Sequence, residues 1–234
     1  MNIVISGYGK MGRMIEGILQ NKQISYITTE DVKSVASEIA RVSVCIDFTT
    51  PQAIRDNYRF LADNFNSVII GTTGWDDIRN DVIEYFNQKN TTLIYASNFS
   101  IGVNIFFRLA EIVSAFADSF SEYDPYLIEL HHNQKLDAPS GTAKTIADIV
   151  SKQTGRKLEI SSVRAGNIPG IHELGFESEI DRITLRHEAF SRKGFAEGAV
   201  TAAIWTENLK GVYDFKTLLD DKFNEIINNI YYNQ

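Results

Sequence analysis

The chain has 234 residues, which is enough for one large domain or two small ones that each bury a hydrophobic core. Hydrophobic residues make up 44% and charged residues 23% of the sequence, as in ordinary soluble globular proteins. A formal net charge of −7 argues against nucleic acid or an anionic membrane as the main partner, but it leaves room for a small anionic ligand held by local cations.

The only cysteine, Cys45, lies in the apolar run 42–48, where we expect it to be buried and reduced. The sequence has no disulfide framework and no Cys/His spacing typical of zinc sites, so we expect no bound metal. Met1 leads directly into a strand-like segment instead of a signal peptide, and no apolar run is long enough to span a bilayer. These features predict a cytoplasmic protein.

The first predicted element is a buried strand, Asn2–Ser6, which ends at a glycine-rich loop and is followed by a helix over 13–19. In this context G-x-G-x-x-G is the dinucleotide fingerprint: Gly7 makes the tight turn, Gly9 lets the backbone approach a pyrophosphate, and Gly12 lets the helix pack on the strand. The alternative is a turn that binds nothing. The loop residues expected to contact the cofactor are Gly7, Tyr8, Gly9, Lys10, Met11 and Gly12.

A second strand over 25–28 ends near Glu30, about 20 residues from the loop, where an acidic residue can bind the ribose hydroxyls of a dinucleotide. No Arg or Lys stands beside Glu30 to pair with a 2′-phosphate, and Lys33 is the nearest cation. The alternative is that Glu30 and Asp31 simply begin a short helix.

Further strands over 42–48, 67–70 and 91–95 alternate with helices over 52–64 and 76–88. This alternation predicts an N-terminal Rossmann-like, doubly wound parallel α/β sheet over 1–99 as the dinucleotide-binding domain. Ligands bind such sheets at the carboxyl ends of the strands, where small and hydroxyl residues gather in this sequence. The candidates at these ends are Gly71, Thr72, Thr73, Ala96, Ser97, Asn98 and Phe99.

After residue 100 the pattern changes from regular alternation to long helices and consecutive strands. We expect a second α+β domain with a mixed sheet over 100–205, serving substrate binding and oligomerisation, and a tail over 206–234 that packs back on the first domain. The predicted strands cover 126–130, 160–163, 176–180 and 182–187, and the predicted helices cover 101–120, 143–153, 194–205 and 215–230.

One short stretch of this second domain combines an acid, a cation and an anion cradle. His131 and His132 can exchange protons near neutral pH, and Lys135 supplies a cation. Ser140, Gly141 and Thr142 offer backbone N–H groups and hydroxyls to an anion at a helix start. The two histidines are adjacent in a strand and point to opposite faces unless the strand ends there. By spacing alone, a surface histidine pair is the alternative.

Together these motifs resemble the dihydrodipicolinate reductase (4-hydroxy-tetrahydrodipicolinate reductase) family of bacterial lysine and diaminopimelate biosynthesis. The most specific is His131-His132-x-x-Lys135-x-Asp137-Ala138-Pro139-Ser140-Gly141-Thr142-Ala143. The resemblance also covers Gly7 to Gly12, Asp47 to Thr49, Gly71 to Gly74, Asn98 to Ser100 and Arg192 to Ala203.

The resemblance implies that the protein uses NADH, NADPH or both to reduce 4-hydroxy-tetrahydrodipicolinate, a small dicarboxylate, to tetrahydrodipicolinate. It also implies that the protein is a homotetramer. It implies that His131 is the acid/base residue, that Lys135 is a second proton donor, and that His132, Gly141 and Thr142 contact the substrate. It also implies that Gly7 to Gly12, Gly71 to Thr73 and Ala96 to Phe99 hold the cofactor. The stretch between Thr29 and Val44 is shorter than in many members, which leaves the cofactor preference open.

Two other functions fit the same fold. A non-catalytic dinucleotide-sensing module needs the glycine loop but not His131, Lys135 and the Ser-Gly-Thr turn together. Another two-domain NAD(P)-dependent dehydrogenase of a small oxo acid is the second alternative, although an aldehyde-oxidising version needs a nucleophilic cysteine. We place His172 and His187 outside the site and treat Arg164 as a candidate carboxylate contact.

Overall fold

The computed structural model describes residues 1–120 and 122–232; Asn233 and Gln234, at the end of the expected tail, lie outside this part. The chain divides into two compact units. Unit 1 comprises Met1–Ser100 and Lys193–Gln234, and unit 2 comprises Ile101–Arg192. Among the described residues, no helix has the length and apolar character needed to cross a membrane.

Unit 1 is built on a six-stranded sheet whose neighbouring strands are all parallel, in the order β10-β5-β4-β3-β1-β2. Its strands are β1 (Asn2–Ser6), β2 (Ser25–Thr29), β3 (Ser43–Asp47), β4 (Ser67–Ile70), β5 (Thr92–Tyr95) and β10 (Val212–Asp214). Short β-branched runs such as 43–47 are buried along their whole length, because helices cover both faces of the sheet. The predicted Rossmann-like fold is confirmed, and β10 is an additional edge strand that the sequence did not reveal.

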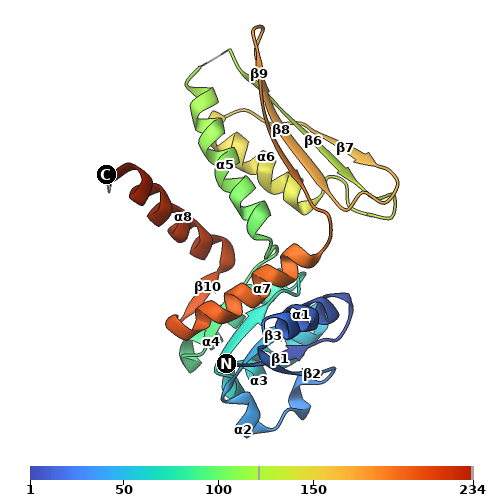
Figure 1. Cartoon of the computed structure of the whole chain (residues 1–234), viewed down its shortest axis with the longest axis vertical. Helices are drawn as coiled ribbons and strands as arrows, with labels where there is room; N and C mark the ends of the chain where they lie inside the picture. The colour runs from blue at the N-terminus through green and yellow to red at the C-terminus, as the bar shows by residue number, and fades with distance from the viewer. Residues whose placement is uncertain (121, 233–234) are drawn as a thin grey trace. The chain divides into compact units, whose positions relative to one another are not determined.

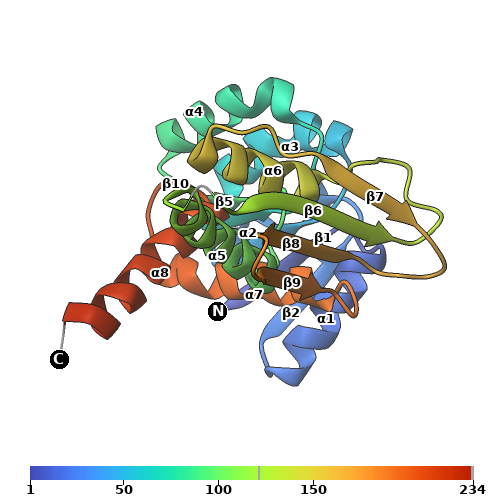
Figure 2. The ribbon, with the colours of Figure 1, turned by 90° about the horizontal axis from the view of Figure 1, so that it is seen from above.

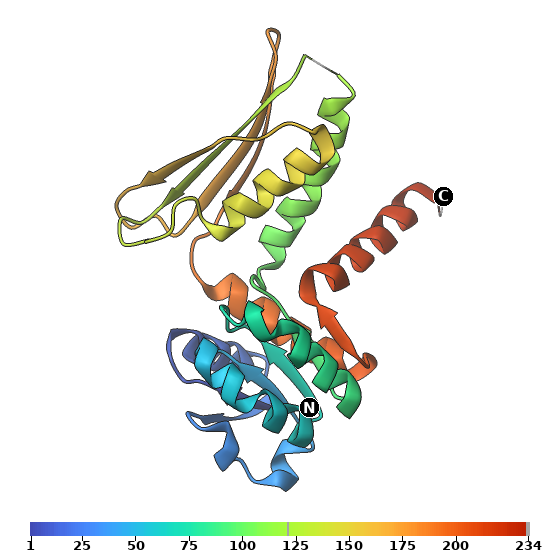
Figure 3. The ribbon, with the colours of Figure 1, turned by 180° about the vertical axis from the view of Figure 1, so that it is seen from behind.

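Helices cover both faces of this sheet, with α1 and α7 on one face and α3 and α4 on the other (Figures 1 and 3). Thr50 caps α3 by accepting a hydrogen bond from the backbone N–H of Ala53, and Pro51 occupies the first turn, as predicted. The helices are α1 (Lys10–Asn21), α2 (Ser37–Ala40), α3 (Pro51–Asn64), α4 (Arg79–Lys89), α7 (Lys193–Trp205) and α8 (Phe215–Tyr232), with short turns at Val32–Ser34, Asp76–Ile78 and Thr206–Asn208.

The α7 helix differs from expectation, because it belongs to unit 1 and not to the second domain predicted over 100–205. It packs against α1 and against the strands β3 and β4. Gly198 makes this packing possible, since a Cβ atom at that position would lie 1.7 Å from the backbone oxygen of Phe99. The glycine at this position of α7 therefore serves a close contact within unit 1.

Unit 2 contains a mixed four-stranded sheet in the order β7-β6-β8-β9, in which only β6 and β7 run parallel. The α5 and α6 helices pack on one face of this sheet (Figures 1 and 2). The elements are α5 (Ile101–Asp118), β6 (Asp124–His131), α6 (Gly141–Thr154), β7 (Ile160–Arg164), β8 (Ile171–Glu177) and β9 (Arg182–Glu188). The predicted strand over 176–180 was misplaced: the strand covers Ile171–Glu177 and contains His172.

Candidate active site

The aligned strand ends of unit 1 gather the predicted cofactor segments at one edge of the sheet. Thr29, Ser6, Asp47, Ile70 and Tyr95 lie side by side as the last residues of their strands. The order in which successive strands are added to the sheet reverses between β1 and β3, and ligands bind doubly wound sheets at such a point. The segments that start at this edge begin with Gly7, Glu30, Phe48, Gly71 and Ala96.

The glycine loop has the geometry that a phosphate-binding turn requires. Gly7 has a φ of +87°, and its N–H donates to the backbone oxygen of Thr29 at 3.0 Å. A Cβ atom on Gly12 would lie 2.2 Å from the Gly7 oxygen, so only glycine lets α1 start this close to the loop. A Cβ atom on Gly9 would meet nothing within 4 Å, so the loop is open where the helix begins. These residues fit a dinucleotide pyrophosphate at the start of α1.

Asp47 ties the neighbouring loops together, and sequence reasoning did not include it in the site. Its carboxylate is 1% exposed and accepts hydrogen bonds from Ser6 Oγ at 2.8 Å, Thr49 Oγ1 at 2.7 Å and Thr72 Oγ1 at 2.9 Å. Burial raises the pKa of Asp47, although these hydrogen bonds favour the charged form. The sequence signal was an aspartate at the end of an apolar strand, followed by Thr49. Asp47 positions the β3 and β4 loops.

The side chains of several predicted cofactor-binding residues pack against or hydrogen-bond to other residues of unit 1. Phe99 is 2% exposed and packs against Phe215, with 4.8 Å between ring centroids. Asn98 Oδ1 accepts from the Ser100 backbone N–H at 2.8 Å. The Tyr8 hydroxyl donates to Glu16. Such residues can reach a ligand mainly through backbone groups and ring faces, whereas Ser97 and Thr73 are exposed at the same edge.

Glu30 and Asp31 have different surroundings at the end of β2. Asp31 accepts a hydrogen bond from the Lys33 N–H at 3.0 Å and caps the short helical turn that follows. The capping role that the sequence left open between the two acids therefore falls to Asp31. Glu30 is exposed immediately after the strand.

In unit 2 a row of polar side chains crosses the sheet on the face covered by α5 and α6. Ser162, Glu129, His172 and His187 are paired across the four strands in register. Leu127 lies two residues before Glu129 on β6 and belongs to the core under the helices. Because side chains alternate along a strand, Glu129 and His131 extend the same face toward the end of β6.

Glu129 is at the centre of this cluster, with no exposed side-chain surface. Its Oε1 accepts from Ser140 N at 3.0 Å, Ser162 Oγ at 2.7 Å and Arg164 Nη2 at 2.8 Å. Burial would raise the pKa of Glu129, but the hydrogen bonds from Ser140, Arg164 and Ser162 outweigh it and lower that pKa to about 2. Glu129 is therefore a buried carboxylate that stays charged.

Two histidines lie against the other oxygen of Glu129. Its Oε2 lies 3.1 Å from His131 Nδ1 and 3.8 Å from His172 Nε2. Burial lowers the pKa of His131, and the negative charge of Glu129 opposes this. Burial, followed by the proximity of His131, lowers the pKa of His172 to about 4, so His172 is neutral at pH 7.

The strand ends between the two histidines, which is the exception that the alternation argument allowed. His131 is the last residue of β6 and is 7% exposed, whereas His132 follows the strand and is half-buried. Lys135 Nζ donates to Asp137 Oδ1 at 2.7 Å in the loop that follows. Arg164 Nη2 donates to the backbone oxygen of Asp137 at 2.5 Å. Arg164 therefore holds this loop in addition to pairing with Glu129.

The three residues of the predicted anion-binding turn differ in burial at the start of α6. Ser140 is 2% exposed, its hydroxyl accepts from the Ala143 N–H at 3.2 Å, and its own N–H donates to Glu129. Gly141 is exposed and Thr142 is half-buried at the first turn of the helix. Backbone N–H groups of a first turn have no partner within the helix, so this turn can bind a carboxylate.

Sequence reasoning missed Glu129 and His172 as members of the site. Potential metal-ligating atoms of Glu129, His131 and His172 lie within 4.8 Å of one another. Arg164 already pairs with the Glu129 carboxylate at 2.8 Å, which supplies the positive charge that a cation would bring. We therefore interpret the cluster as a proton-transfer site.

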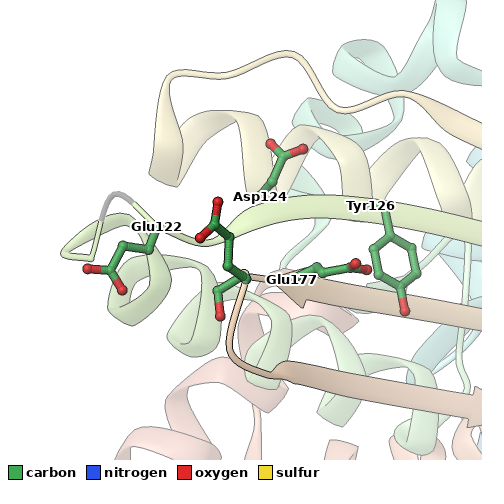
Figure 4. Close-up of a pocket in the computed structure, with 6 residues that line it drawn as sticks. Glu122, Asp124, Tyr126 and Glu177 are labelled. Carbon is green, nitrogen blue, oxygen red and sulfur yellow. The ribbon is translucent and has the colours of Figure 1, made fainter.

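A separate hollow lies at the opposite end of β6 from His131. It is lined by Glu122, Asp124, Tyr126, Glu177, Ser178 and Glu179 (Figure 4). Its carboxylates would repel a dicarboxylate, so it does not fit the predicted substrate. Cys45 is also unsuited to catalysis, since it is fully buried in β3 and burial raises the pKa of its thiol.

Comparison with known proteins places these features in a family. Residues 15–99 match the family model described as "Dihydrodipicolinate reductase, N-terminus", and residues 102–219 match "Dihydrodipicolinate reductase, C-terminus". A curated 4-hydroxy-tetrahydrodipicolinate reductase of Christiangramia forsetii is 36% identical over 237 residues, which cover 95% of this chain and 99% of the relative. The enzyme of the same name from Methanococcoides burtonii is 36% identical over 216 residues, covering 85% of this chain and 81% of the relative.

The fold has solved counterparts. Dipicolinate-bound dihydrodipicolinate reductase from Paenisporosarcina sp. TG-14 superposes with a TM-score of 0.74 at 23% identity, covering 92% of this chain and 97% of that chain. Aspartate dehydrogenase from Thermotoga maritima superposes with a TM-score of 0.50 at 13% identity, covering 91% and 99% of the two chains. At these identities both comparisons concern the fold alone.

Proposed function

The chain belongs to the dihydrodipicolinate reductase family, and we propose that it reduces 4-hydroxy-tetrahydrodipicolinate with His131 as the proton donor. The enzyme is an oxidoreductase of lysine and diaminopimelate biosynthesis that uses a nicotinamide dinucleotide. The observation that carries the residue assignment is that His131 is buried beside the charged carboxylate of Glu129, which also accepts the backbone N–H of Ser140 at the start of α6.

The nicotinamide cofactor supplies the hydride when it is bound. In our proposal the Gly7 to Gly12 loop holds its pyrophosphate through backbone N–H groups, because Gly9 leaves the start of α1 open. The segments Gly71 to Thr73 and Ala96 to Phe99 hold the rest of the cofactor along the same sheet edge. The protein contributes position and electrostatics.

His131 would act through its Nε2 atom. Its Nδ1 faces Glu129, whereas Nε2 lies 3.1 Å from the position that a Cβ atom on Gly170 would occupy. Protonated His131 donates the Nε2 proton to the substrate as negative charge develops on the reduced ring. The neutral histidine that remains keeps its other proton on Nδ1, beside the carboxylate.

The substrate is a dicarboxylate, so the site needs positive groups. We propose that Lys135 binds a carboxylate and provides the second proton, and that the first turn of α6 binds a carboxylate through Gly141 and Thr142. Ser140 contributes by capping this turn, and half-buried His132 contacts the substrate from the loop.

The deciding assay follows NADH and NADPH oxidation with substrate made freshly by the preceding synthase. We expect oxidation that depends on both the protein and the cyclic substrate. The double variant Lys135→Ala/Gly141→Pro is a matched negative control, because it removes the cation and a first-turn N–H group and leaves the unit 1 loop unchanged. Absence of oxidation with either cofactor would reject the reductase function.

We propose that Glu30 binds the ribose hydroxyls and that the enzyme prefers NADH, since an exposed carboxylate there repels a 2′-phosphate. Replacing Glu30 with alanine is expected to weaken NADH binding more than tenfold, or about 1.4 kcal/mol. Fluorescence titration with NADH and NADPH measures the change. Glu38→Ala, which removes another exposed acid from the same region, serves as the control. Equal NADH affinity in both variants would remove Glu30 from the site.

We propose that the enzyme is a homotetramer joined through the sheet of unit 2. The face away from α5 and α6 carries the apolar side chains of Ile128, Leu130 and Val163, and Val163 is 41% exposed. Apolar surface of this kind is typical of an interface between subunits. Sedimentation equilibrium should give four times the 26.4 kDa chain mass, and Val163→Glu should lower the mass.

A further inference from the structure

Glu129 has two oxygens with different roles, and only one of them is explained by folding. Oε1 is saturated by Ser140, Ser162 and Arg164, which fix the carboxylate to the start of α6 and to β7. Oε2 is buried and has no hydrogen-bond partner among the described residues. Buried carboxylate oxygens are normally hydrogen-bonded, so an oxygen left in this state needs a reason.

The reason lies 3.1 Å away, at His131 Nδ1. This nitrogen is also buried without a hydrogen bond among the described residues. At 3.1 Å the two atoms are within hydrogen-bonding distance, so each is a suitable partner for the other. Gly170 leaves space on the opposite side of the ring, where a Cβ atom would stand 3.1 Å from Nε2.

We propose that Glu129 is a positioning residue that holds His131 with Nδ1–H toward the carboxylate and Nε2 toward the substrate. The same carboxylate accepts the Ser140 N–H, so it fixes the proton donor relative to the anion-binding turn of α6. This inference rests on the proposed function of His131. It assigns to Glu129 the choice of which imidazole nitrogen carries the proton in the neutral state.

The charge of Glu129 also affects the pH at which His131 is protonated. The groups that act on His131 come from every neighbouring element: Glu129 on β6, His172 on β8, Arg164 on β7, and Lys135 and Asp137 in the following loop, with His187 of β9 behind His172. Burial, Lys135 and Arg164 lower the pKa of His131, while Glu129 and Asp137 raise it. Glu129 is the nearest of the groups that raise it.

The sign of the pH effect follows from the role of His131 as an acid. Activity needs protonated His131, so it is present below the His131 pKa and is lost as the pH rises through it. Replacing Glu129 with glutamine removes the nearest negative charge and keeps an oxygen for Ser140 and Ser162. The alkaline limb of kcat should therefore move to lower pH by about one unit, since an opposite charge at this range shifts a pKa by one to three units.

The experiment compares Glu129→Gln with Ser162→Ala, which removes one hydrogen bond from Oε1 but keeps the charge beside His131. We expect a kcat at least tenfold lower, with the shifted limb, in Glu129→Gln alone, and no shift in Ser162→Ala. Equal shifts in both variants, or an unshifted limb in Glu129→Gln, would overturn the proposal. Loss of activity in His131→Asn combined with a wild-type profile in Glu129→Gln would reject the positioning role and leave the proposed function intact.

A second measurement tests the proposal on the wild-type protein, even if the variant does not fold. Nitrogen-15 chemical shifts of His131 in the wild-type protein above its pKa report which ring nitrogen carries the proton. We expect the Nδ1–H tautomer in the wild type, with the alternative tautomer gaining population in Glu129→Gln. A wild-type His131 in the Nε2–H tautomer would overturn the proposal even if Glu129→Gln cannot be purified.

Discussion

Replacing His131 with asparagine is expected to lower kcat by about 10²- to 10⁴-fold, the usual loss when a general acid is removed. Asparagine has a similar size and can occupy the end of β6, but it cannot deliver a proton near neutral pH. The Kd of NADH should stay within about twofold, because the Gly7 to Gly12 loop belongs to unit 1 and His131 belongs to unit 2. Steady-state NADH oxidation and fluorescence titration measure the two quantities.

His132→Asn is the matched control for this prediction. His132 is half-buried beyond the end of β6, whereas His131 is buried beside Glu129. We expect the control to raise the substrate KM while retaining most of kcat, since a substrate contact contributes binding and not proton transfer. If His131→Asn keeps wild-type turnover, or if the two variants behave alike, His131 is not the acid.

The fold of unit 1 could be predicted because its signals are local. Each strand is a short apolar run, and each helix start has its own marker, such as Thr50 and Pro51 before α3. The edge strand β10 has only three residues, all half-buried, so it carries too little apolar pattern to be recognised. The local sequence pattern predicts elements that bury a whole face. Short edge strands do not bury a whole face, so the pattern does not reveal them.

The placement of α7 could not be predicted from its own sequence. Its small residues fit either a subunit interface or a tight intramolecular contact. The choice depends on the backbone of Phe99, which is 99 residues before Gly198 and approaches within 1.7 Å of where a Cβ would stand. Such a contact between distant parts of the chain leaves no mark in local composition.

The candidate site shows the same limit in a different form. His131 and Lys135 share one stretch of sequence with the proposed anion-binding turn, so the sequence could group them as candidates. His172 comes 41 residues after His131 and reaches the site only because β6 and β8 pair with Glu129 opposite His172. β8 has His172 and Glu173 near its start and so lacks a continuous apolar run, and the strand was predicted at 176–180, which left His172 outside any strand. The error in the bounds of this one strand thus excluded a buried histidine from the predicted site.

The second prediction with a large expected effect concerns Gly12, where the packing of α1 and the proposed cofactor site both depend on the absence of a Cβ atom. Replacing Gly12 with alanine should destabilise the protein by about 1–3 kcal/mol, because the new Cβ would meet the Gly7 oxygen, a backbone atom that cannot rotate away. The distance available is 2.2 Å, which forces α1 and the loop apart. NADH affinity should fall more than tenfold, since the loop N–H groups would lose their alignment with the helix start.

Gly17→Ala on the same helix is the matched control. A Cβ at Gly17 would meet nothing within 4 Å, so the change should stabilise α1 by about 0.5–1 kcal/mol through reduced backbone entropy of the unfolded chain. Urea unfolding measures both stabilities, and titration of the folded variants measures NADH binding. If Gly12→Ala binds NADH as tightly as Gly17→Ala does, the close approach of α1 to Gly7 serves packing only, and the pyrophosphate must bind elsewhere on the sheet edge.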